Sequence, residues 1–131
     1  FKKDLRPFLY VRAKNVAREI DGDFQALDMS LASLVVYESV YVERLSDAVL
    51  EALRCGRVGA VVFFSKRTAI NFVKLVENYA LHAHLKSIKA LCISEGVLEC
   101  VRAEFWAEVL VAAQPDRRGI AVLLENMRKA P

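Results

Sequence analysis

A hydroxyl followed by two cations stands directly after an apolar run in the middle of the chain. The residues are Ser65, Lys66 and Arg67, and the run is Ala60 to Phe64. A serine at a helix start can cap free N–H groups, and cations beside it attract carboxylate or phosphate. The segment therefore predicts either a receiver for an anion or a capping serine with two solvated side chains.

Three further polar residues end or directly follow apolar runs: Arg12, Tyr37 and Ser94. In a parallel α/β sheet, ligands bind outside the carboxyl ends of the strands, so these residues are candidates for the same cleft. Tyr37 could donate a proton or a hydrogen bond there, or pack in the core with its hydroxyl at the rim.

Other kinds of site find little support in the sequence. Neither a phosphate loop nor a dinucleotide fingerprint occurs, and the chain has only 5 glycines. His82 and His84 form an H-x-H pair without a Cys or carboxylate cluster, so we expect surface histidines and no metal. Cys55, Cys92 and Cys100 form no C-x-x-C pair and lie in apolar stretches; we expect small buried thiols in a reducing cytoplasm.

The bulk composition is that of one ordered α/β domain. The chain has 131 residues, of which 55% are hydrophobic and 27% charged, with a formal net charge of +3. This mild charge favours a small anionic ligand over nucleic acid, and no apolar run is long enough to cross a membrane. The start at Phe1 lacks an initiator Met and a signal-peptide pattern, so we expect a truncated start and a cytoplasmic protein.

The elements that would position these residues alternate between strand and helix. Nearly continuous apolar runs predict buried parallel strands at 8–12, 33–38, 60–64, 88–93 and 109–112. Helical spacing joins Leu45, Val49, Ala52 and Leu53; Ala69, Phe72, Val73 and Val76; Val97, Val101 and Phe105; and Ile120, Leu123, Leu124 and Met127. A first crossover helix is placed near 22–27. The pattern predicts a doubly wound, flavodoxin-like α/β sheet of about five strands.

Capping residues support these boundaries. Ser46 and Asp116 are suitable helix starts, and Gly56 suits the left-handed position that ends a helix.

The order of short motifs along the chain resembles one enzyme family. The motifs are Leu9 to Arg12 (LYVR), Val35 to Glu38 (VVYE), Gly59 to Ala69 (GAVVFFSKRTA), Leu91 to Ser94 (LCIS) and Val109 to Asp116 (VLVAAQPD). Together they are similar to the C-terminal half of uroporphyrinogen-III synthases, particularly the α-proteobacterial form. Each motif alone is weak, but five in the right order are fairly specific.

The resemblance implies a two-lobed, cytoplasmic lyase that acts as a monomer at full length. It would close linear hydroxymethylbilane into uroporphyrinogen III with loss of water and inversion of the last ring, without metal or organic cofactor. Residues 1–38 would complete the second lobe, 39–131 would form the main α/β lobe, and the N-terminal half would be missing. Tyr37 would be the proton donor, and Arg12, Ser65, Lys66, Arg67 and Ser94 would bind the substrate carboxylates.

The sequence departs from the family pattern in two loops. Val97 stands where the family usually has a substrate-contacting threonine, Ser94 replaces a glycine, and Glu95 brings a negative charge. Ala13 replaces a glycine after Arg12. A non-catalytic flavodoxin-like ligand-binding or interaction module, or a degenerate synthase domain kept for protein interaction, remains an alternative.

Overall fold

A computed structural model describes residues 8–13, 31–37 and 43–129 of the chain; for residues 12–13 and 31–37 it describes the backbone only. It contains one five-stranded sheet in the order β2-β1-β3-β4-β5, with every neighbouring pair parallel. The strands are β1 (Phe8–Ala13), β2 (Leu31–Tyr37), β3 (Ala60–Phe63), β4 (Lys89–Cys92) and β5 (Glu108–Val111). The predicted doubly wound, flavodoxin-like sheet is confirmed.

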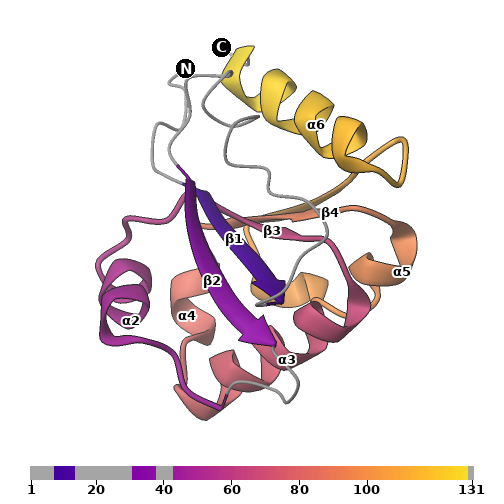
Figure 1. The fold of residues 1–131 in the computed structure, drawn as a ribbon. Coiled ribbons are helices and arrows are strands. Elements are labelled where there is room, and N and C mark those ends of the chain that lie inside the picture. The colour runs from indigo at the N-terminus through magenta and orange to yellow at the C-terminus, as the bar shows by residue number, and fades with distance from the viewer. Residues whose placement is uncertain (1–7, 14–30, 38–42, 130–131) are drawn as a thin grey trace.

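Helices cover the sheet on both sides (Figure 1). They are α2 (Asp47–Arg54), α3 (Lys66–Asn78), α4 (His82–Leu85), α5 (Glu95–Leu98) and α6 (Arg117–Lys129), with a 3-10 turn, η1 (Ala103–Phe105). Figure 1 shows α6 on one side of the sheet and α2, α3 and α4 on the other. This is the layer arrangement that right-handed crossovers on both sides of the switch in strand order produce.

The five predicted strands are present, each within two residues of the expected bounds at either end. The central strands are apolar on both faces because helices lie above and below them. All four residues of β3 are buried. The side chains at 60 and 62 belong to the smaller hydrophobic core, which lies between the sheet and α6, and those at 61 and 63 belong to the larger core on the opposite face of the sheet.

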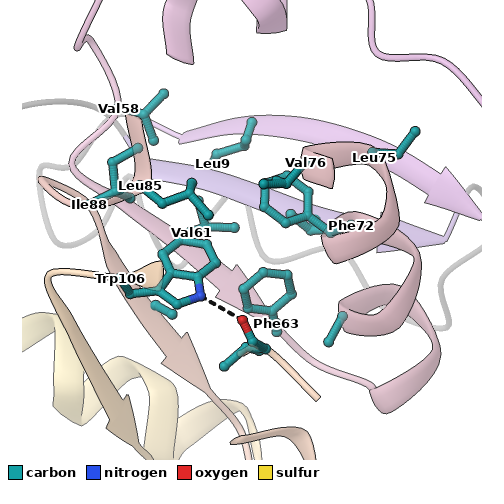
Figure 2. Close-up of a cluster of buried hydrophobic side chains, with 14 of the residues drawn as sticks. Leu9, Val58, Val61, Phe63, Phe72, Leu75, Val76, Leu85, Ile88 and Trp106 are labelled. Carbon is teal, nitrogen blue, oxygen red and sulfur yellow. Dashed lines mark hydrogen bonds between the residues drawn. The ribbon is translucent and has the colours of Figure 1, made fainter. Parts of the chain in front are cut away.

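Aromatic rings form the centre of the larger core (Figure 2). Trp106 meets the ring of Phe63 edge to face, with centroids 5.8 Å apart, and lies stacked at 6.1 Å from Phe72. The buried indole Nε1–H donates to the carbonyl of Val101 at 2.7 Å, which satisfies both groups away from water. Phe63, the last residue of β3, therefore packs against two aromatic rings, those of Phe72 and Trp106.

The predicted helix caps are confirmed, but one predicted helix is not. Ser46 and Asp116 accept hydrogen bonds from the first turns of α2 and α6, and Gly56 has φ +72, as predicted. A continuous helix through Val97 and Phe105 is wrong. The left-handed φ of +60 at Arg102 separates α5 from η1, although the apolar residues of that stripe still face the core.

A second correction concerns the cysteines. Cys55 is exposed at the end of α2, Cys92 is buried and Cys100 is half-buried. The prediction of buried thiols therefore fails for Cys55, because its apolar neighbours lie on the opposite face of an amphipathic helix.

Two predictions remain open. The crossover helix near 22–27 falls outside the described residues. Strands β1 and β2, which precede residue 38, share one sheet with β3, β4 and β5, and the division into 1–38 and 39–131 across two lobes of a longer enzyme stays a prediction. Across the described ranges, no helix is both long and apolar enough to cross a membrane.

Candidate functional site

The sheet order brings the candidate residues to one edge. Strand order reverses between β1 and β3, and the crevice beyond the carboxyl ends of two such strands is the usual ligand site of an open α/β sheet. Arg12 lies in β1 one residue beyond Val11, whose register partner is Phe63, and Ser65 follows β3 two residues after Phe63. Arg12 and Ser65 therefore belong to the two strands that border this crevice.

Tyr37 and Ser94 extend the same edge in opposite directions. Tyr37 is the last residue of β2, paired with Ala13 across a register shift, and Ser94 follows β4 two residues after Cys92. The side chains of Arg12 and Tyr37 lie outside the described residues, so their roles stay predictions. At the level of the backbone, strand order places Arg12, Tyr37, Ser65 and Ser94 at the same edge.

Ser65 caps α3 through a closed pair of hydroxyl contacts. Its Oγ accepts from the N–H of Thr68 at 3.2 Å and lies 3.0 Å from Thr68 Oγ1, which in turn donates to the Ser65 carbonyl at 3.1 Å. Thr68 has one hydroxyl hydrogen, so both contacts form only if Ser65 donates to Thr68. The capping interpretation of Ser65 is correct, and its proton reaches a ligand only if the pair rearranges.

Thr68 is the residue that sequence reasoning missed at this loop. The spacing S-x-x-T could have indicated it, because a residue three positions after an N-cap faces the capping side chain.

Ser94 caps α5 with a simpler contact. Its Oγ accepts from the N–H of Val97 at 3.3 Å, and no other described residue forms a hydrogen bond with the hydroxyl. The hydroxyl hydrogen of this half-buried serine thus has no competing acceptor in the described part of the chain. Of the two serines, Ser94 is the better placed to donate to a carboxylate.

The departures from the family pattern have structural consequences on α5. Val97 is only 2% exposed and packs in the larger core, so a side chain at this position does not face a ligand. Glu95 is exposed beside it. With valine buried, Ser94 carries the only hydroxyl of the segment 93–98.

Two exposed cations follow Ser65 in the first turn of α3. Lys66 and Arg67 are exposed, and Arg67 takes part in an interaction with another residue. Lys66 forms no hydrogen bond or ion pair with any residue in the described ranges, and its side chain extends toward α5. A free ammonium close to helix starts favours an anion.

Beneath this edge, Cys92 is an inert thiol. Burial raises its pKa to about 12, and the nearby Cys100 and Glu95 act in the same direction. A neutral thiol is a poor nucleophile, so Cys92 fills the core and does not react.

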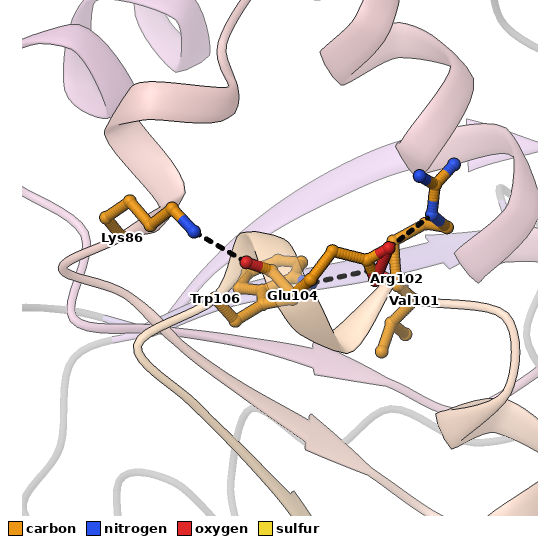
Figure 3. Close-up of polar contacts among 5 residues, drawn as sticks. All are labelled: Lys86, Val101, Arg102, Glu104 and Trp106. Carbon is orange, nitrogen blue, oxygen red and sulfur yellow. Dashed lines mark hydrogen bonds and ion pairs between the residues drawn. The ribbon is translucent and has the colours of Figure 1, made fainter.

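The opposite end of the sheet holds structural contacts. Figure 3 shows Lys86 Nζ donating to the Glu104 carbonyl at 2.6 Å and Arg102 pairing with the Glu104 carboxylate at 3.0 Å. The pKa of Glu104 is lowered, first by a hydrogen bond from its own backbone and then by Arg102. His82 is half-buried against the Phe105 ring at 4.7 Å, and the described residues contain no group of three metal-binding side chains.

An apolar cavity of about 230 Å³ also lies away from the candidate site. Its lining includes Phe8 at the start of β1, Val49 and Ala52 of α2, and Val58 before β3. None of the proposed substrate-binding residues lines it.

Comparisons with known proteins give the family of the chain. Residues 1–121 match the family profile described as uroporphyrinogen-III synthase HemD. A crystal structure of uroporphyrinogen-III synthetase from Helicobacter pylori is similar at 20% identity and a TM-score of 0.49, over 92% of this chain and 53% of that one. The chain thus spans about half the length of that enzyme. No match was found among curated proteins. Since the family profile covers nearly its whole length, the chain belongs to the uroporphyrinogen-III synthase family.

Proposed function

We propose that the protein containing this chain is a uroporphyrinogen-III synthase, a lyase that cyclises hydroxymethylbilane with loss of water and inversion of the last pyrrole. The observation that carries the proposal is the family match over residues 1–121. The gathering of Ser65, Lys66 and Ser94 near one edge of the sheet supports it, because the substrate is a flexible polycarboxylate.

In this proposal the residues of the edge hold the substrate carboxylates. The first N–H groups of a helix have no acceptor within the helix, so the starts of α3 and α5 offer donors beside the two serines. Ser94 donates its hydroxyl hydrogen, Lys66 and Arg67 supply charge, and Arg12 adds a cation from β1. Holding a flexible chain in one conformation removes much of the entropic barrier to ring closure.

Tyr37 has the chemical role in the proposal. Its phenol donates a proton to the departing hydroxyl, which leaves as water, and the pyrrole chain becomes a delocalised cation. The terminal ring attacks this cation and closes the macrocycle, and the proton released in ring closure returns to the phenolate. A positioned acid is typically worth ~10²–10⁴-fold in rate. The remainder of catalysis is orientation of the substrate.

The test is a coupled assay on the full-length protein. A preceding enzyme supplies fresh hydroxymethylbilane, and chromatography separates type III from type I product after oxidation. We expect type III product above the spontaneous type I background. Only type I product at every protein concentration would contradict the proposal and favour a binding or interaction module.

A further inference from the structure

Gly96 lies in α5 although nothing in the backbone requires glycine there. It is the second residue of the helix, and its φ is not in the left-handed region, unlike that of Gly56. Glycine is a poor helix former compared with alanine. The absence of a side chain at this position therefore has a spatial rather than a conformational reason.

The space beside Gly96 is occupied by the side chain of Lys66. A Cβ on Gly96 would lie 2.5 Å from Lys66 Cε and 3.2 Å from Lys66 Nζ, and 3.8 Å from Ser94 Oγ. Lys66 belongs to α3, so its side chain crosses from the start of one helix to the start of another. The Lys66 ammonium and the Ser94 hydroxyl both lie within 4 Å of the place that a Cβ on Gly96 would take.

We infer that Gly96 is a positioning residue, which keeps open the path by which the Lys66 ammonium reaches the edge between Ser65 and Ser94. The inference rests on the proposed function, in which that ammonium pairs with a substrate carboxylate. Lys66 forms no ion pair with the described residues, so its charge is available to a ligand. Any side chain at position 96 pushes the ammonium away while the charge stays on the protein.

The displacement is structurally cheap, and this makes it testable. The atoms that a new Cβ would meet are the flexible far end of a lysine, and the nearest other atom is at an ordinary contact distance. Gly96→Ala should therefore move the ammonium without unfolding the chain.

The activity experiment compares the wild type, Gly96→Ala, Lys66→Met and the double variant of the full-length protein. We expect each single variant to raise KM for hydroxymethylbilane roughly two- to five-fold, the scale of one exposed ion pair, with kcat almost unchanged. In the Lys66→Met background, Gly96→Ala should add nothing. An equal KM increase in both backgrounds would show that position 96 acts on its own and overturn the inference. Lys74→Met, a charge loss at an exposed site farther along α3, is the control.

A second readout does not depend on catalysis. Benzene hexacarboxylate, used as a polycarboxylate probe, should raise the Tm of the wild type and of Lys74→Met, and raise that of Gly96→Ala and Lys66→Met less. The same shift in all four proteins would overturn the inference. If the protein forms no type III product but the Tm shifts differ as expected, the proposed function fails and the Gly96–Lys66 arrangement stands.

Discussion

Ser65 and Ser94 occupy equivalent positions on neighbouring strands. Each stands two residues beyond one member of the register pair Phe63 and Cys92, and each caps the helix that follows. Their hydroxyls nevertheless differ. Ser65 is engaged with both the N–H and the hydroxyl of Thr68, whereas Ser94, within the part of the chain that the structure describes, accepts from Val97 alone. In the proposed function, we therefore expect Ser65 to act mainly as a helix cap and Ser94 to be the better donor to a substrate carboxylate.

This difference predicts opposite effects of two similar substitutions. Ser65→Ala should lower the free energy of unfolding by about 1–2 kcal/mol, the cost of a good N-cap, with little change in KM. Ser94→Ala should cost less stability, since it caps a single turn, and raise KM by the equivalent of ~1 kcal/mol. Urea unfolding and the type III assay measure the two quantities.

Ser46→Ala is the matched control for these variants. Ser46 caps α2 and lies far from the candidate site: the N–H of the preceding Leu45 donates to the hydroxyl of Tyr79, which follows the last residue of α3, whereas Ser65 precedes the first. Ser46→Ala should therefore lower stability without changing KM. A larger KM effect for Ser65→Ala than for Ser94→Ala would reverse the assignment.

Gly119 should tolerate no side chain. A Cβ there would overlap the carbonyl oxygen of Gln114 and lie 2.9 Å from Ala112 Cβ, and the Gly119 N–H is held at 2.8 Å by Asp116. Since backbone cannot move aside as a lysine end can, Gly119→Ala should destabilise by about 1–3 kcal/mol. Gly96→Ala, compared in the same urea titration, should change stability far less. Equal stabilities of the two variants would contradict this prediction and show that the backbone before α6 shifts at little cost to make room for the new Cβ.

The indole of Trp106 contributes both aromatic packing and a hydrogen bond to the core (Figure 2). Trp106→Phe keeps an aromatic ring against Phe63 but leaves the Val101 carbonyl without its donor in a buried site. Loss of the partner alone should cost about 1–3 kcal/mol, with a further contribution from the cavity. Chemical denaturation measures the change; a variant as stable as the wild type would mean that water reaches the carbonyl.

The buried thiol of Cys92 makes stability depend on pH at the alkaline end. Burial raises the pKa of the Cys92 thiol from its ordinary value of 9.0 to about 12 in the folded chain, so above pH 9 the unfolded state binds fewer protons than the folded state. The contribution is complete below pH 9 and is lost as pH rises toward 12, at up to ~1.4 kcal/mol per pH unit. Urea unfolding at several pH values should show a shallower decline in Cys92→Ala, whose other titrating groups are unchanged. Identical slopes would mean that the thiol ionises without unfolding.

The sequence could predict the sheet because four of its five strands are short apolar runs between helical stripes, and parallel strands covered on both faces must look that way. It could also predict which residues reach the carboxyl edge, since strand ends fix that. It could not show that Lys66 crosses to Gly96, because that contact joins residues 30 positions apart through two separate loops. Nor could it separate α5 from η1, since the apolar spacing continues across the left-handed turn at Arg102.

Tyr37 carries the prediction that bears most directly on mechanism. Its place at the end of β2 puts the residue at the edge where the proposed substrate binds. Tyr37→Phe removes one hydroxyl and no charge, so the carboxylate contacts that hold the substrate remain. We therefore expect kcat for type III product to fall by ~10-fold or more, while KM changes less than twofold. Rapid-quench measurement with product separation distinguishes the two constants, and Tyr79→Phe, a tyrosine whose hydroxyl accepts from Leu45 at 3.3 Å, controls for loss of a phenol elsewhere. If Tyr37→Phe turns over at the wild-type rate, proton donation comes from water or another group, and orientation of the substrate at this edge accounts for catalysis.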